Sequence, residues 1–208
     1  MFDYLRDPDE IYRRSFERLR AECDLSAVPD DLAPVALRLV HACAMPDILD
    51  DLAWDGEVAA AGRGALQAGA PVIADCRMTM DGVIRARLPA DNPVLCPLDD
   101  ARVPGLAHER GTTRSAAAVD LWRPDIEGAV VAIGNAPTAL YRLLEILLDG
   151  APRPAVVLAF PVGFVGAAES KQALIEAGLG VPYLTLRGRR GGSALAAAAV
   201  NALASSAP

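Results

Sequence analysis

The sequence of 208 residues contains one lysine, Lys171, and two histidines, His41 and His108. All other basic side chains are arginines, and the formal net charge at pH 7 is −7. Nucleic-acid-binding proteins usually expose dense clusters of Lys and Arg, so this acidic chain is a poor candidate for that class. Two histidines without clustered cysteines also argue against a protein-held transition metal, and we predict no metal site.

Cysteine motifs and targeting segments are missing as well. The four cysteines, Cys23, Cys43, Cys76 and Cys96, form no Cys-x-x-Cys pair, which argues against a zinc ribbon or a thioredoxin-like site. The N-terminus has no basic segment followed by an apolar run, and no apolar run is long enough to cross a bilayer. We therefore expect reduced thiols, a cytoplasmic location and no membrane partner.

The chain also lacks the familiar motifs of nucleotide and acyl chemistry. It has no Gly-x-x-x-x-Gly-Lys-Ser/Thr loop, no Gly-x-Gly-x-x-Gly after a strand and no Gly-x-Ser-x-Gly elbow. ATP, NAD and acyl-transfer functions are weak candidates for that reason. Apolar residues make up 52% of the chain, an ordinary globular composition. We predict one domain over residues 1–208, with a loose tail at 205–208.

Helical spacing dominates the first third of the sequence. Asp7 and Pro8 are typical of a helix start, and the apolar residues that follow recur at helical intervals up to residue 23. Further helices are predicted at residues 31–49 and 56–68. In the helix at 31–49, Arg38 and His41 lie roughly opposite the apolar side.

From residue 71 onward, short apolar runs alternate with helices. The predicted strands are residues 71–75, 94–96, 130–133, 155–160 and 183–186. Repeated strand–loop–helix units indicate right-handed crossovers and a parallel sheet. We predict an α/β fold with a mainly parallel sheet of about five strands. The N-terminal helices should flank this sheet.

Three glycine-containing loops follow predicted strands, at residues 134–138, 161–166 and 188–193. In open parallel sheets, ligands bind outside the carboxyl ends of the strands. Any βα turn can use such residues, but three of them together favour a binding crevice. His41 is a candidate proton donor or acceptor, because imidazole titrates near neutrality, although a surface histidine on a helix has the same pattern. His108 lies in a polar loop, where we expect it to be exposed.

Several strings of residues occur in an order that is specific for one family. They are residues 11–16 (IYRRSF), 38–42 (RLVHA), 113–117 (TRSAA), 132–140 (AIGNAPTAL), 161–171 (PVGFVGAAESK) and 188–194 (GRRGGSA). Together they make the chain similar to the precorrin-8X methylmutases of cobalamin biosynthesis, from about residue 4 to residue 203. The resemblance implies an isomerase that moves a methyl group of a corrinoid from C-11 to C-12, formally a [1,5]-sigmatropic shift. The product would be hydrogenobyrinic acid or its cobalt-bearing counterpart, cobyrinic acid.

The same resemblance implies further properties. It implies a Rossmann-like three-layer α/β/α sandwich around the parallel sheet, no cofactor, and a homodimer that binds the macrocycle near the subunit interface. By correspondence with the family, His41 is the catalytic histidine, and Ser15, Arg38 and Arg114 contact the substrate. We add Asn135 and Thr138 as crevice residues because of their position in the loop at 134–138.

Two alternatives remain open at this point. A non-catalytic tetrapyrrole carrier of the same pathway would share the pocket, and only a catalytic role of His41 separates it from the enzyme. An unrelated Rossmann-like enzyme acting on a phosphorylated metabolite is a second alternative, weakened by the missing phosphate motifs. The sequence does not indicate whether the substrate contains cobalt, because such a metal would be held by the macrocycle.

Overall fold

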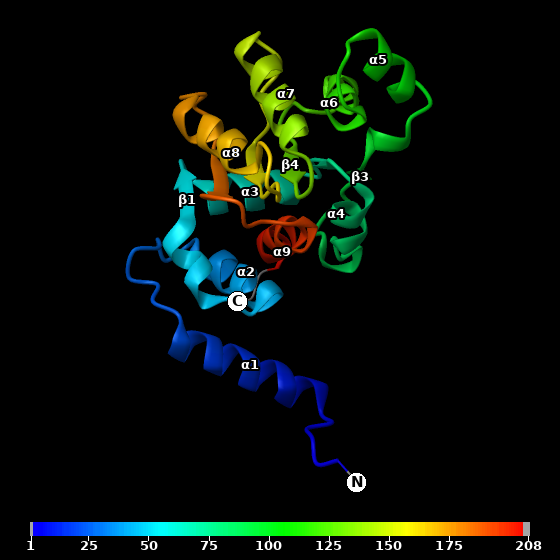
Figure 1. Ribbon diagram of the computed structural model, residues 1–208. Coiled ribbons are helices and arrows are strands. Elements are labelled where there is room, and N and C mark those ends of the chain that lie inside the picture. Colours follow the sequence, from blue (N-terminus) through cyan, green and yellow to red (C-terminus); the bar gives the residue numbers. More distant parts are fainter. Residues whose placement is uncertain (1, 206–208) are drawn as a thin grey trace.

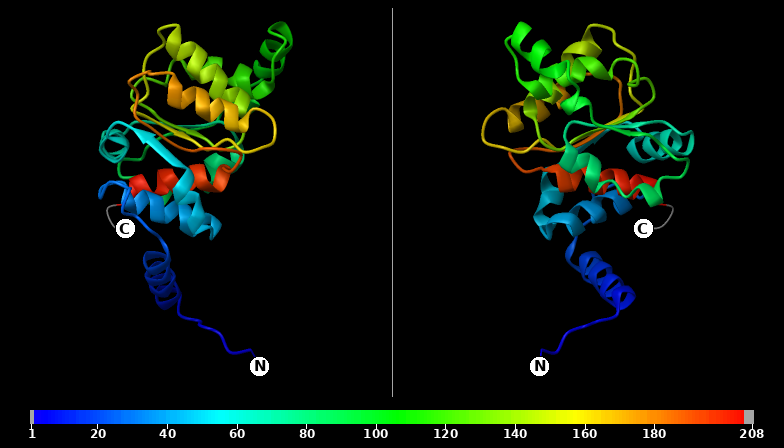
Figure 2. Two further views of the ribbon diagram at one scale, coloured as in Figure 1. Left: turned by 60° about the vertical axis from the view of Figure 1, so that its left-hand side comes forward. Right: turned by 90° about the vertical axis from the view of Figure 1, so that its right-hand side faces the viewer.

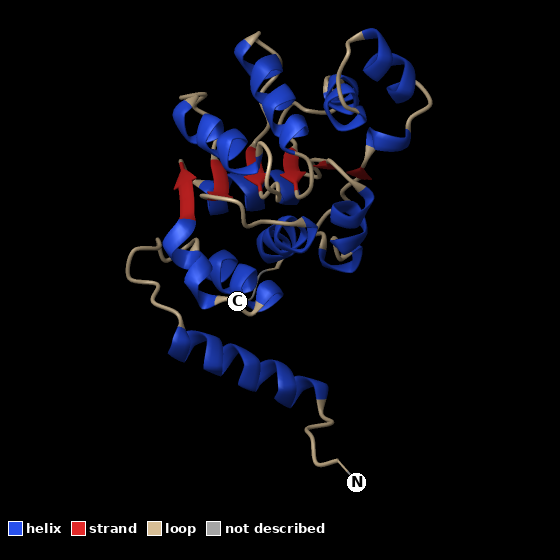
Figure 3. Cartoon of the chain, viewed as in Figure 1, coloured by secondary structure: helices blue, strands red, loops and turns tan. Residues whose placement is uncertain are grey.

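The protein forms three layers, with helices on both faces of one central sheet (Figure 1; Figure 3). The structure is a computed structural model and describes residues 2–205. Six strands lie in the order β1-β6-β5-β4-β2-β3. Their bounds are β1 Leu52–Asp55, β2 Val72–Ala74, β3 Val94–Leu95, β4 Val130–Ile133, β5 Val156–Ala159 and β6 Tyr183–Leu186.

All strand pairs are parallel except that of β1 with β6, which is antiparallel with Leu52 opposite Leu186. The predicted α/β/α architecture with a mainly parallel sheet is therefore confirmed. The sheet has one strand more than expected, and that strand is β1. Its sequence, Leu-Ala-Trp-Asp, contains no β-branched residue and lies between two helical segments, so it carries little strand signal.

Successive residues of the central strands pack in two different hydrophobic cores, one on each face of the sheet. Val130 and Ala132 of β4 pack in the lower core, whereas Val131 and Ile133 pack in the upper core. All four are fully buried. This explains why the central strands appear as continuous apolar runs rather than as alternating patterns, since both faces of the sheet are covered by helices.

The lower layer is built around the C-terminal helix α9. It consists of α2 (Ala33–Cys43), α3 (Val58–Gln67), α4 (Arg77–Gly82) and α9 (Ser193–Ala204), and α9 packs against the other three (Figure 2). The alanine-rich sequence of α9 permits close packing on several sides. A Cβ on Gly82 of α4 would lie only 2.7 Å from the Cβ of Ala197, so glycine is required there.

The upper layer covers the other face of the sheet (Figure 2). Its helices are α5 (Val103–Glu109), α6 (Arg114–Val119), α7 (Pro137–Leu148) and α8 (Ala167–Glu176). Short 3-10 helices complete the fold at η1 (Pro46–Asp51), η2 (Arg85–Arg87), η3 (Pro97–Asp99) and η4 (Asp120–Trp122). Both layers place the amino ends of helices near the carboxyl ends of the parallel strands.

The first helix, α1 (Pro8–Glu22), begins where the sequence predicts. The side chain of Asp7 accepts hydrogen bonds from the backbone N–H groups of Asp9 and Glu10. The expectation that α1 flanks the sheet is wrong, because α1 packs chiefly against α2 and projects away from the layers (Figure 1; Figure 2). Its charged surface has too few apolar residues to cover a sheet face.

The helix predicted at residues 31–49 is shorter than expected. Helix α2 ends at Cys43, and Ala44 adopts a left-handed conformation with φ 54°. Pro46 then begins η1. Proline disfavours helical backbone at the residue before it, which separates the two segments.

At the C-terminus, the hydroxyl of Ser205 donates a hydrogen bond to the carbonyl of Asn201, and the rest of the predicted loose tail, 206–208, lies outside the described residues.

Candidate functional site

The connections of the sheet reverse direction between β2 and β4, which is where open parallel sheets have their ligand crevice. From β2 the chain continues to β3 at one edge of the sheet, whereas from β4 it continues to β5 and then β6 in the opposite direction. Open parallel sheets bind ligands at such a reversal, outside the carboxyl ends of the strands. Asp75 follows β2 at this point, and Gly134 and Asn135 follow β4.

The carboxylate of Asp75 occupies the anion-binding position of this crevice. It accepts hydrogen bonds from the backbone N–H groups of Gly134, Asn135 and Ala136, at 2.9, 2.9 and 2.8 Å. These N–H groups immediately precede α7, where a phosphate binds in many nucleotide-binding folds. Burial raises the pKa of Asp75, and the three hydrogen bonds oppose that rise. A phosphate cannot use these donors, which argues against the phosphorylated-metabolite alternative.

Three of the predicted substrate residues lie around this crevice. The Asn135 side chain is exposed, and Thr138, the second residue of α7, is half-buried. The Thr138 hydroxyl is 2.8 Å from the hydroxyl of Thr113, which caps α6. Arg114 is the next residue after this cap, and its Nη2 lies 3.6 Å from Asp99 Oδ1. Asn135, Thr138 and Arg114 are therefore brought together at the carboxyl edge of the sheet.

His41 lies at the junction of α1 and α2, in a different layer. Its exposed imidazole lies against the ring of Phe16, with centroids 4.9 Å apart, and meets Tyr12 edge-on at 6.3 Å. Arg38 donates a hydrogen bond of 2.8 Å to the Tyr12 hydroxyl, and its guanidinium lies 5.0 Å from the centroid of Phe16. These contacts hold the imidazole and the guanidinium side by side.

A groove of about 280 Å³ opens beside His41. Its lining residues come from α1, α2 and the turn that follows, and they are Ser15, Arg18, Leu19, Glu22, Val40, His41, Ala44 and Pro46. Ser15 and His41 therefore line the same groove. The pKa of His41 is lowered, first by burial of one side of its ring and then by the positive charge of Arg38.

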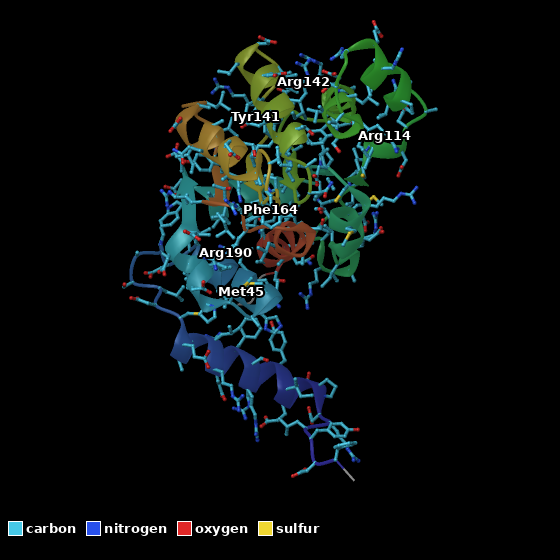
Figure 4. The ribbon with its side chains drawn as sticks, in the orientation of Figure 1. Met45, Arg114, Tyr141, Arg142, Phe164 and Arg190 are labelled. Carbon is cyan, nitrogen blue, oxygen red and sulfur yellow. The ribbon has the colours of Figure 1, made fainter. Side chains whose placement is uncertain are left out.

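The predicted residues form two groups rather than one. His41, Arg38 and Ser15 lie at α1 and α2 below the sheet, whereas Arg114, Asn135 and Thr138 lie at the crevice. In Figure 4, Arg114 lies in the α5–α6 part of the upper layer, whereas Met45, two residues after the end of α2, lies near α2. A single chain therefore does not bring Arg38 and Arg114 to one point.

Comparison with known proteins identifies the family. The sequence profile of precorrin-8X methylmutase (CbiC) matches residues 10–206. The chain belongs to the precorrin-8X methylmutase family. A precorrin-8X methylmutase of Pseudomonas aeruginosa is 59% identical over 204 residues, 98% of either chain. A cobalt-precorrin-8 methylmutase of Priestia megaterium is 33% identical over 197 residues, 94% of this chain and 87% of that protein. A crystal structure of precorrin-8X methylmutase from Thermus thermophilus has a TM-score of 0.85 at 38% identity, covering 94% of both chains.

Sequence reasoning missed two aromatic residues of this methylmutase. Tyr12 and Phe16 look like ordinary members of the apolar side of α1, yet they contact His41 and Arg38. Their spacing of four residues, with Ser15 between them, was the available signal. Asp75 was also missed, because a single aspartate after a strand is common and its three backbone partners are about sixty residues away.

The structure also bears on metals and membranes. Among residues 2–205, no group of three or more His, Cys, Asp or Glu side chains is arranged to hold a metal ion. Within the same residues, no helix has the length and apolar character needed to span a membrane. His108, the second histidine, is exposed as predicted, although it lies in α5 rather than in a loop.

Proposed function

We propose that this chain moves the methyl group at C-11 of a precorrin-8X corrinoid to C-12 and releases hydrogenobyrinic acid. Membership of a family of methylmutases makes it an isomerase of cobalamin biosynthesis. The observation that carries the detailed proposal is the position of His41. Its side chain is exposed and lines an open groove, and the charge of Arg38 lies close enough to act on it. A methyl shift needs a placed proton donor and no protein nucleophile, in keeping with a sequence that has no nucleophile motif.

In the proposed reaction, His41 supplies a proton to a ring nitrogen of the substrate. The protonated ring is electron-poor, which lowers the barrier to migration. The bond from C-11 to the methyl carbon breaks as the bond to C-12 forms, and the ring double bonds move, so that all atoms of the substrate remain in the product. The proton returns to His41 when the neutral corrin forms.

The protonation of His41 depends on substrate binding. In the free protein, burial and Arg38 lower the pKa of His41, so the imidazole is mostly neutral at pH 7. The acetate and propionate carboxylates of a bound corrinoid would bring negative charge close to the ring and raise that pKa. The proton donor is then formed in the complex, where it is needed.

The fringe of carboxylates suits the other proposed substrate residues. Arg38 and Arg114 would each bind a carboxylate through charge-assisted hydrogen bonds, and Ser15, Asn135 and Thr138 would donate further hydrogen bonds. Since these residues fall into two groups in one chain, we propose that the complete site uses both copies of a homodimer. The exposed apolar side chains of the N-terminal segment, Phe2 at 91% and Tyr4 at 64%, support such an interface.

The degree of similarity bears on the metal content of the substrate. The relative named precorrin-8X methylmutase is 59% identical to this chain, and the relative named for cobalt-precorrin-8 is 33% identical. We therefore propose that the substrate is the cobalt-free corrinoid. We also propose a cytoplasmic location, which is supported by the four cysteines, since all four have free thiols.

Single-turnover conversion tests the proposal. Purified protein is mixed with cobalt-free precorrin-8X, and the visible spectrum is followed for the bands of the extended conjugated corrin. Formation of hydrogenobyrinic acid confirms an isomerase, with conversion of the cobalt-bearing substrate much slower. Tight binding of precorrin-8X without conversion would instead establish the carrier. Sedimentation equilibrium on the same preparation checks the dimer.

A further inference from the structure

A second arginine lies against the same carboxylate as Arg114. Arg77 is the first residue of α4, two residues after the crevice residue Asp75. Its Nε donates a hydrogen bond of 2.5 Å to Asp99 Oδ2, while Arg114 Nη2 lies 3.6 Å from Asp99 Oδ1. The two oxygens of one carboxylate therefore face two guanidinium groups, which come from different helices.

This cluster has an excess of positive charge in a chain whose net charge is −7. Asp99 neutralises one of the two arginines and leaves the other uncompensated. The side chains of Arg77, Arg114 and Asp99 are 70%, 58% and 45% exposed. Within the described residues, Nη1 and Nη2 of Arg77 make no hydrogen bond, so these donors are free to bind a ligand.

The chemistry of the cluster fits a carboxylate ligand. Each guanidinium can hold a carboxylate through two parallel hydrogen bonds, and Asp99 already shows how a carboxylate fits between the two arginines. Thr138 lies close to this cluster, because its hydroxyl contacts the hydroxyl of Thr113, the residue before Arg114. Asn135 lies three residues before Thr138 at the crevice.

We propose that Arg77 acts with Arg114 to bind one carboxylate of the corrinoid fringe, and that Asp99 is an internal stand-in which this carboxylate displaces. The inference rests on the proposed function, because that function supplies a ligand with several carboxylates. Exposed ion pairs contribute little net free energy, so replacing the Asp99 carboxylate by a substrate carboxylate costs little free energy. In the free protein, Asp99 holds both arginines near their binding positions.

The two roles give opposite predictions for two substitutions. Arg77→Gln removes one of the binding cations and weakens product binding. Asp99→Asn removes the competing carboxylate and strengthens product binding. Both side chains are largely exposed, so neither substitution disturbs the core. Arg153→Gln is the matched control, because it removes the same charge from an exposed arginine that precedes β5, at the opposite end of the strands.

The experiment titrates hydrogenobyrinic acid into the parent protein and the three variants at low salt, with absorbance or calorimetry as the readout. We expect Kd to rise by about tenfold or more for Arg77→Gln, to fall by about threefold for Asp99→Asn, and to stay within about twofold for Arg153→Gln. The differences should shrink in 0.5 M salt, because exposed charges are screened.

Three results would overturn the inference while leaving the proposed function intact. They are an unchanged Kd for Arg77→Gln, equal weakening by Arg77→Gln and Arg153→Gln, and weakening rather than tightening by Asp99→Asn. A parent protein that neither binds nor forms hydrogenobyrinic acid would overturn the proposed function itself, and this inference with it.

Discussion

The imidazole of His41 lies on the ring of Phe16, with their centroids 4.9 Å apart and their planes 26° apart. The guanidinium of Arg38 lies over the same phenyl ring, 5.0 Å from its centroid. Phe16 is 4% exposed and therefore forms a fixed surface. It positions a titratable ring and a permanent cation next to each other, and the first prediction follows from that pair.

Replacing Arg38 with Ala should raise the pKa of His41. The positive charge of Arg38 disfavours the imidazolium, so its removal makes protonation easier. Burial still acts on the ring, and the pKa should stay below its ordinary value of about 6.5. Proton NMR of the imidazole signals measures this directly, and His108→Gln assigns the signals because the chain has only two histidines. A pKa that is the same with and without Arg38 would contradict the electrostatic argument.

Asp75 should be important for stability even though it lies at the crevice. Asp75→Ala leaves the backbone N–H groups of Gly134, Asn135 and Ala136 without their acceptor. We expect the free energy of unfolding to fall by about 3 kcal/mol, the scale of a lost buried network. Urea unfolding measures the change, with Asp125→Ala, an exposed aspartate, as the control. Equal stabilities of the two variants would show that the crevice loop does not depend on this carboxylate.

The only lysine, Lys171, is fully buried in α8, and its Nζ donates a hydrogen bond of 2.6 Å to the carbonyl of Arg190. Burial lowers the pKa of Lys171 to about 8. The unfolded chain binds this proton up to about pH 10.5, so between the two values the unfolded state holds more protons than the folded state. Stability contributed by this group therefore increases with pH across that window.

The variant Lys171→Met isolates this effect. Between pH 7.5 and 9.5, the free energy of unfolding of the parent should rise by about 2 kcal/mol relative to Lys171→Met. Comparing the two proteins at each pH cancels the titration of other groups, such as cysteines and tyrosines. A difference that stays constant over this range would show that Lys171 keeps an ordinary pKa in the fold, and a decrease with pH would contradict the lowered pKa outright.

The fold was predictable to the extent that each element is encoded by its own residues. The strands β4, β5 and β6 are apolar runs followed by glycine-containing loops, and these were predicted almost to the residue. Strand β1 was not, because its stability comes from pairing with β6, which is about 130 residues further along the chain. The early end of α2 is encoded by Pro46, and the apolar pattern alone led the prediction past it.

In the candidate site too, features encoded within one helix were predictable, whereas contacts between separate elements were not. His41 stood out because it lies opposite the apolar side of its own helix, and the structure leaves it exposed. The contact of Phe16 with His41, and that of Asp75 with the loop before α7, join separate elements. Such contacts appear only once the chain is folded. The separation of His41 from Arg114 likewise depends on the layer in which each helix packs.

The central claim is that His41 performs the chemistry, and single-turnover conversion of precorrin-8X by His41→Ala tests it most directly. Product binding is measured separately, and His108→Ala is the matched control. Since His41 is exposed, the variant should keep its fold and bind hydrogenobyrinic acid, but convert substrate ~100- to 10,000-fold more slowly. His108→Ala should convert at the parent rate. Conversion by His41→Ala at the parent rate would contradict the account and remove His41 from the mechanism.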